Sequence, residues 1–210
     1  QNWSSVGVLP NAHENGRDVL AEKLRVYVHQ QNKSGYVYVT INDIQYKITS
    51  NIEPYTAEVF SLFNKDVNIT EITIPETIVV DGITYTVTSI GEYAFSECTS
   101  MDNLPIPESV ETIGANAFEK CSRLVTVNMS KTVKEIGVKA FFECKDLGTV
   151  TFAENSVINK IADNAFLDCS SLYKITIPGS ISELGEGVFK NCTGLKDVTF
   201  GDNSKVVKLK

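Results

Sequence analysis

The sequence predicts an α/β-type solenoid, a right-handed coil with a parallel sheet on its concave side and short helices or 3₁₀ turns on its convex side. The main observation is a phrase, Ile-Gly-x-x-Ala-Phe-x-x-Cys-x-x-Leu, that occurs five times. The copies follow one another at steps of 23, 23, 25 and 23 residues and begin at Ile90, Ile113, Ile136, Ile161 and Leu184. A fixed period of about 20 to 50 residues is typical of solenoids, in which each unit stacks on the next.

A short stretch of alternating apolar residues precedes each phrase and predicts the strands of the concave sheet. In the repeat at residues 124–147, Val127 and Met129 are apolar at a spacing of two, which is the period of a strand. The corresponding stretches are residues 72–74, 104–106, 150–152, 175–177 and 198–200. Because stacked units place these stretches side by side, we expect a parallel sheet with strands roughly 4.8 Å apart.

The phrase itself predicts the convex wall. In the same repeat, Ala140, Phe141 and Cys144 lie at helical spacing after Gly137, where the chain must turn. This pattern favours a helix of one to two turns or a 3₁₀ segment. We expect the Phe and Cys positions of successive copies to form ladders through the interior.

The N-terminal third predicts β-hairpins that cover the open end of the coil. Residues 41–50 align with residues 80–89, and each stretch has a two-residue turn, Asn42-Asp43 and Asp81-Gly82, between alternating strands. Such turns between alternating strands are a strong hairpin signal. We therefore divide the chain into a lead-in at residues 1–35, a hairpin cap with a strand leading into the coil at residues 36–90, and repeats at residues 91–210, the array itself beginning at about residue 69.

One part of the lead-in is ambiguous. In residues 18–30, Leu20, Leu24 and Val28 suit a helix, whereas Val26 and Val28 alternate as in a strand. We favour the helix.

Two loops are longer than their counterparts. Residues 153–156 contain a two-residue insertion, and residues 201–204 are built in the same way, so that Leu209 stands where a sixth phrase would begin. Terminal repeats normally need a cap. We therefore expect either that the native protein continues past Lys210 or that the last strand leaves an edge through which copies associate weakly.

Composition and charge exclude several classes of function. The formal net charge of −7 and the pI of about 4.9 argue against nucleic acid or an anionic membrane as the main partner, since both require a basic face. No apolar run reaches the roughly 18 to 20 residues that span a bilayer. The first residue is Gln1, not Met, which removal of a secretory signal would explain.

No residue pattern predicts catalysis, a metal or a cofactor. The five cysteines are at least 23 residues apart, whereas zinc sites use close Cys pairs, so we expect buried free thiols. His13 and His29 have no partners placed by the sequence. Gly185-Glu186-Gly187 lies inside a repeat phrase and lacks the context of a dinucleotide fingerprint.

The phrase, extended to Ile-Gly-x-x-Ala-Phe-x-x-Cys-x-x-Leu-x-x-Ile-x-Ile-Pro, resembles the BspA-like (Treponema-type) leucine-rich repeat family, which is found mainly in bacterial surface proteins. The resemblance covers residues 69–210, and residues 84–91 are similar to the usual start of such arrays in Bacteroidetes. Ala162, Leu184 and Val188 depart from the pattern. The resemblance implies a non-enzymatic protein that is extracellular or on the outer cell surface. Some members adhere to host matrix proteins or to other microbes.

The residues between the buried positions of the predicted concave strands are the candidates for binding. Adjacent strands place them side by side, and we expect the following residues to face a ligand: Asp102, Asn103, Thr126, Asn128, Thr149, Thr151, Tyr173, Lys174, Thr176, Lys196, Asp197 and Thr199. An alternative is that they only decorate the sheet with good strand formers. The function predicted is adhesion to a protein of a host matrix or microbial surface, or to a glycan. The alternative is a stalk with no ligand of its own.

Overall fold

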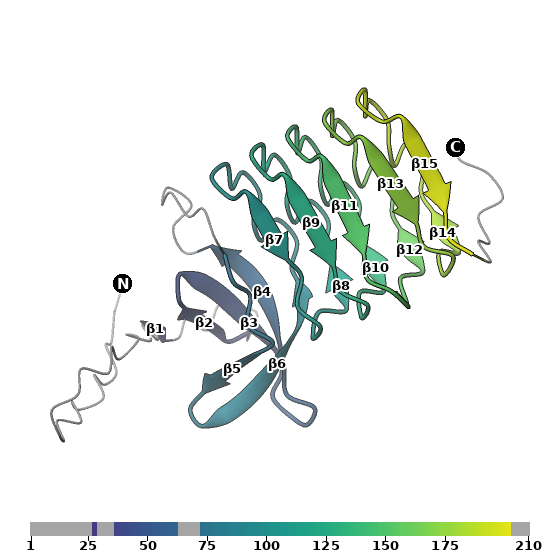
Figure 1. The fold of residues 1–210 in the computed structure, drawn as a ribbon. Coiled ribbons are helices and arrows are strands. Elements are labelled where there is room, and N and C mark those ends of the chain that lie inside the picture. The colour runs from purple at the N-terminus through teal and green to yellow at the C-terminus, as the bar shows by residue number, and fades with distance from the viewer. Residues whose placement is uncertain (1–26, 29–35, 63–71, 203–210) are drawn as a thin grey trace, which may run out of the picture.

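The chain forms a β-solenoid in which the repeats lie side by side between two walls (Figure 1). The computed structural model describes residues 27–28, 36–62 and 72–202. One wall is a five-stranded parallel sheet, named sheet B here, of β7 (Asn103–Pro105), β9 (Thr126–Met129), β11 (Thr149–Phe152), β13 (Lys174–Ile177) and β15 (Asp197–Phe200). The other, sheet A, includes the two-residue strands β8 (Thr112–Ile113), β10 (Glu135–Ile136), β12 (Lys160–Ile161) and β14 (Glu183–Leu184).

Sheet B confirms the predicted strands in five repeats. Leu104, Val127, Val150 and Ile175 occupy equivalent positions and are buried, while the residues on either side of them face outward. Each strand pairs in parallel with the next, as Val127 does with Val150 and Ile175 with Val198. The alternation of apolar and polar residues thus corresponds to a buried and an exposed face of sheet B.

The expected strand at residues 72–74 is not formed, although Ile72 and Ile74 are buried. Ile106 N donates to Asn128 O on the β9 side of β7. Because successive N–H groups of a strand point to opposite sides, the N–H that would face residues 72–74 belongs to position 105. That residue is Pro105, which has no N–H to donate.

The convex wall differs from the expectation, because the described residues contain no helix. The phrase forms consecutive turns: Ala94 N donates to Gly91 O and Cys98 N to Phe95 O, while Phe95 N donates to Ala117 O of the next repeat at 2.8 Å. Two residues per repeat have positive φ, for example Asn116 at 52° and Lys120 at 58°. A helix needs negative φ throughout. Alternate N–H groups therefore bond to the neighbouring repeat instead of along a helix.

Stacked aromatic rings fill the interior behind these turns. The ring centroids of Phe95, Phe118, Phe141, Phe166 and Phe189 are 5.3, 5.0, 5.2 and 5.9 Å apart in order, with planes within 11° of parallel. The first four side chains are fully buried. Parallel rings at these distances add about 0.5–1.5 kcal/mol per pair to the burial of their area. The predicted Phe ladder is confirmed.

Four of the five phrases have Gly at the second position, where the backbone of the preceding repeat approaches closely. A Cβ at Gly137 would lie 2.7 Å from Ala115 N, and one at Gly185 would lie 2.4 Å from Asp163 N. Neither residue has positive φ. The glycine therefore admits the main chain of the preceding repeat. Ala162 occupies this position in one repeat.

Both predicted hairpins are present. β2 (Tyr38–Ile41) pairs antiparallel with β3 (Ile44–Ser50), and β5 (Thr77–Val80) pairs antiparallel with β6 (Ile83–Ile90). Asn42 and Asp43 have φ of 48° and 62°, and Asp81 and Gly82 have φ of 50° and 80°. Two consecutive positive φ values are typical of the type I′ turn that such sequences favour.

The stacking of the coil begins before the first phrase. β4 (Thr56–Leu62) pairs in parallel with β6, and Gly91 N donates to Val59 O at 2.7 Å. The same bond joins Gly114 N to Ile90 O one repeat later, also at 2.7 Å. Val59 therefore takes the place of the phrase's Ile in the turn that precedes the first copy.

The expected helix at residues 18–30 is not found where the structure describes that segment. Tyr27–Val28 form β1, which pairs antiparallel with β2. The remaining residues of the segment lie outside the described ranges. Tyr27–Val28 therefore follow the alternating pattern and not the helical one, because they can pair with β2 at the edge of sheet A.

The ladder assignment predicts that Phe141→Ala lowers the free energy of unfolding by about 3–5 kcal/mol, as is typical when a fully buried Phe leaves a cavity. Phe142→Ala is the matched control, because Phe142 is the adjacent residue and is only half-buried. Thermal and urea unfolding measure both variants. An unchanged melting curve for Phe141→Ala, or equal losses for the two variants, would contradict the ladder.

Candidate functional site

The outward face of sheet B carries the residues predicted to meet a ligand. All twelve lie in its strands or directly before them, and each has an exposed or half-exposed side chain. The parallel register brings them into columns, with Thr126 beside Thr149 and Thr149 beside Lys174. The structure thus gathers these residues on one face, and their role as ligand contacts stays a prediction.

Several of these residues already bond to one another. Thr151 Oγ1 donates to Asn128 Oδ1 at 2.7 Å, and the hydroxyls of Thr176 and Thr199 lie 2.8 Å apart. These pairs align the hydroxyls along the sheet and leave acceptor positions free, since a hydroxyl oxygen has two lone pairs. The face therefore presents ordered hydrogen-bonding groups.

The charges at the β7 end of the face are paired, whereas Lys174 is not. Arg123, which is not among the predicted residues, places its Nη2 3.3 Å from Asp102 Oδ1. Lys174 forms no ion pair with any residue in the described ranges. Exposed pairs contribute little to stability. Lys174 and Lys196 are thus two cations of the face that have no carboxylate partner among the described residues.

Tyr173 is the most prominent aromatic residue of the face, with 55% of its side chain exposed. The ammonium group of Lys196 lies 5.2 Å from the ring centroid, within the range of a cation–π contact. Lys196 comes from the next repeat, where its N–H donates to Tyr173 O at 2.9 Å. One face of the ring is therefore covered by the lysine.

A hollow of about 840 Å³ lies over β11 and β13. It is lined by residues 148–156, 173–176, 178–180 and 201–202. Five of the predicted residues line it: Thr149, Thr151, Tyr173, Lys174 and Thr176. The other seven lie on the same sheet outside the lining.

The loops of this hollow are not among the predicted ligand-facing residues. Residues 153–156 carry the two-residue insertion, while the next loop, at residues 178–180, has no insertion. Unequal loop lengths in successive repeats leave a step at the edge of the sheet. The insertion was the signal in the sequence that could have located the hollow.

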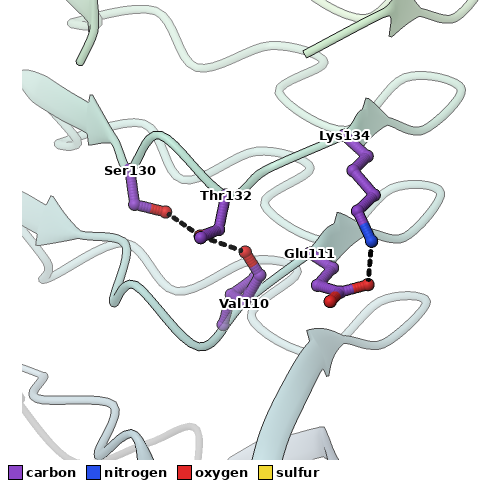
Figure 2. A network of polar contacts seen from close by, with 5 residues as sticks. All are labelled: Val110, Glu111, Ser130, Thr132 and Lys134. Atoms are coloured by element: carbon purple, nitrogen blue, oxygen red, sulfur yellow. Dashed lines mark hydrogen bonds and ion pairs between the residues drawn. The ribbon is translucent and has the colours of Figure 1, made fainter. Parts of the chain in front are cut away.

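Polar side chains at the edge next to β9 hold neighbouring loops together, as Figure 2 shows. Thr132 Oγ1 lies 3.0 Å from Ser130 Oγ and donates to Val110 O at 3.0 Å. Lys134 Nζ lies 2.6 Å from a carboxylate oxygen of Glu111. These groups join one repeat to the preceding one. Their partners are all within the chain, which makes them part of the stacking.

The cysteines are free and buried, as predicted. Cys121, Cys144, Cys169 and Cys192 each donate from Sγ to a Phe carbonyl of the preceding repeat at 3.0–3.1 Å. Burial raises the pKa of the Cys144 thiol well above its ordinary value and raises the pKa of Cys192 to about 11. A thiolate is the form that reacts and binds metals. These thiols are thus hydrogen-bond donors of the core.

The described residues contain no group of three or more His, Cys, Asp or Glu side chains placed to hold a metal ion. His13 and His29 lie outside the described ranges. No helix of the described residues is long and apolar enough to cross a bilayer.

A family model, the BspA type leucine-rich repeat region, matches residues 58–196 in six copies. The chain belongs to this family. The match begins at residue 58, next to Val59. The carbonyl of Val59 accepts from Gly91 N, which is the bond at which the stacking of the coil begins.

Solved structures of leucine-rich repeat proteins share this fold. A leucine rich cell surface protein from Faecalibacterium prausnitzii is 28% identical over 79% of this chain and 43% of its own, with a TM-score of 0.65. A leucine-rich repeat protein from Bacteroides ovatus is 32% identical over 76% of this chain and 40% of its own, with a TM-score of 0.68. The leucine-rich repeat protein of T. pallidum, at 23% identity and a TM-score of 0.63, matches in fold.

The chain spans less than half the length of the Faecalibacterium and Bacteroides proteins. No curated protein matches it.

The buried thiols of the BspA-type repeats predict a loss of stability in alkali. Folding raises the pKa of these thiols, so the protonated thiol stabilises the folded state. Its contribution to the free energy of unfolding is fully present below the ordinary thiol pKa of 9.0. That contribution decreases as the pH rises towards the pKa in the folded state, which is about 11 for Cys192. Urea unfolding at a series of pH values measures this decrease. The variant Cys144→Ala/Cys169→Ala controls for Lys and Tyr titration and should show a smaller slope. Equal slopes would contradict the assignment.

Proposed function

We propose that this leucine-rich repeat protein of bacterial surface-protein type is a binding module, and that its ligand docks on the outward face of sheet B. The observation that carries the proposal is the hollow over β11 and β13, because it coincides with five residues chosen for their place in the repeat. Concave sites with a few polar groups are the usual places where ligands bind. An exposed tyrosine and an unpaired lysine at the same site support this function further.

We also propose an extracellular or outer-surface location for the protein. The solved relative from Faecalibacterium prausnitzii is itself described as a cell surface protein. The cysteines are compatible with such a place, because all five are buried and four of their thiols donate to a carbonyl within the core. A module of this kind would meet proteins or glycans of a host or of other microbes.

The hairpins at residues 36–62 and 77–90 are proposed as a cap. Val59 O accepts from Gly91 N, and Leu62 N donates to Ala94 O. Those groups would otherwise stand at the open end of the stack, where unpaired edges invite association. The hairpins thereby support a rigid coil in which the binding face keeps its shape.

A stalk without a ligand is the second candidate. The chain spans less than half the length of two solved relatives, and a coil of stacked repeats can project a neighbouring domain. The exposed residues of sheet B would then be strand formers with no partner. The two functions differ in whether the chain has a saturable ligand.

Substitution of Tyr173 and Lys174 by Ala tests the binding function. We expect at least about a ten-fold weaker Kd with an unchanged melting temperature, since aromatic and charged anchors dominate binding energies. Glu92→Ala/Val138→Ala, at exposed positions of the turn segments away from sheet B, is the control. Surface plasmon resonance against immobilised host matrix proteins and a glycan array provides the measurement. Absence of any saturable ligand at micromolar concentration would favour the stalk.

A further inference from the structure

Gly148 is a glycine that neither the backbone conformation nor the packing requires. Its φ is not positive, and a Cβ built there would meet its nearest atoms, Asp146 O and Ser171 O, at 3.9 Å. That is an ordinary van der Waals distance. Gly137 and Gly185 differ, because a Cβ there would lie at 2.7 or 2.4 Å from backbone nitrogen. The absence of a side chain at Gly148 thus has no structural cause in the coil.

Gly148 belongs to a column of residues, one from each repeat, that directly precede the strands of sheet B. The missing side chain therefore leaves a gap in this column. Backbone hydrogen bonds link the residue before each strand of sheet B to its counterpart: Val125 N to Asp102 O, Gly148 N to Val125 O, Tyr173 N to Gly148 O and Lys196 N to Tyr173 O. Val125 and Tyr173 are 45% and 55% exposed. Gly148 therefore leaves a notch between two projecting side chains, and it lines the hollow.

The notch lies beside the free face of Tyr173. Lys196 occupies one face of the ring from the next repeat. Gly148 belongs to the repeat on the other side, so the opposite face of the ring looks over a position without a side chain. A flat apolar surface with open space in front of it suits a ring-shaped ligand whose C–H groups lie against the tyrosine.

The remaining lining is rich in small groups that both donate and accept hydrogen bonds. They are the hydroxyls of Thr149, Thr151, Thr176, Ser156 and Ser180 and the amide of Asn155. Sugar hydroxyls likewise donate and accept. The charged groups of the lining are one cation, Lys174, and two anions, Glu154 and Asp202, which together leave a formal charge of only −1. A strongly anionic or cationic ligand would need an excess of one sign.

We propose that the hollow over Gly148 binds a neutral oligosaccharide, with one sugar ring in the notch against Tyr173. This proposal rests on the proposed binding function and specifies its ligand class. The hollow, at about 840 Å³, lies within the usual range of roughly 300–1,000 Å³ for small-ligand sites. A protein interface is instead broad and shallow. The Thr and Asn side chains would bond to hydroxyls of the sugar units along β11 and β13.

The test uses an array of neutral oligosaccharides, their sialylated and sulfated counterparts, and immobilised matrix proteins. We expect saturable binding to one or more neutral glycans that is insensitive to salt, since no counterions are released on binding. Gly148→Trp should abolish this binding by filling the notch. Val138→Trp, at an exposed position of the turn segments and outside the lining, should leave it unchanged. Tyr173→Ala should weaken it about ten-fold, the loss of one aromatic contact.

Melting temperatures of the three variants show whether each is folded, and Gly148→Ala should melt as the parent does. If Gly148→Trp does not fold, Tyr173→Ala at its exposed position decides the test. Neutral-glycan binding that is unaffected by Tyr173→Ala or by a folded Gly148→Trp overturns the proposal. Binding only to matrix proteins or charged glycans also overturns it but leaves the binding function standing. No saturable binding to any probe overturns both.

Discussion

The bond between repeats that follows each short strand of sheet A fixes the spacing of the coil. Gly114 N, Gly137 N, Ala162 N and Gly185 N each donate to the Ile carbonyl of the preceding repeat at 2.7–2.9 Å. This approach brings the turn after the strand so near its neighbour that most repeats have Gly there. The same spacing places the Phe rings at 5.0–5.9 Å and allows each thiol to reach a carbonyl. The interior is therefore a set of columns in which like stacks on like.

These columns explain why the Cys side chains, which could in other settings react or bind a metal, serve the fold here. A Cys thiol that donates to the Phe carbonyl of the previous repeat adds a second hydrogen bond to an oxygen that already accepts a backbone N–H within its own turn, as Phe118 O accepts from both Cys121 N and Cys144 Sγ. The Phe ring beside it is closed to solvent on both faces by its neighbours. Side chains can differ between repeats only where a column is exposed, as in the column that runs from Asp102 through Gly148 to Lys196. Variation of side chains along such a column shapes the binding face.

Much of this could be predicted from the sequence. The period fixed the solenoid, the alternation located five strands of sheet B, and the turns at Asn42-Asp43 and Asp81-Gly82 located both hairpins. These signals are local. The convex wall was not predictable in the same way, because the spacing of Ala140, Phe141 and Cys144 also fits a helix. The turns exist only because a neighbouring repeat accepts the hydrogen bonds that a helix would make internally.

The candidate site was predictable in part for the same reason. Alternation identified outward residues such as Thr151 and Thr176, but it could not show that Tyr173 stands beside an empty position at Gly148. That relation depends on which residues share a column across a gap of 25 positions. The loop at residues 153–156 was visible as an insertion, and only the stack shows that it borders a hollow.

Amide hydrogen exchange along the array tests the central claim, that bonds between repeats hold the turn segments in place. The N–H groups of Phe95, Phe118, Phe141 and Phe166 donate to the next repeat at 2.8–3.0 Å. They should exchange as slowly as the amides of sheet B, through global opening of the coil. The exposed amides of Asn51 and Glu53 provide the fast reference. Exchange of the Phe amides at the rate of those two amides would contradict the account.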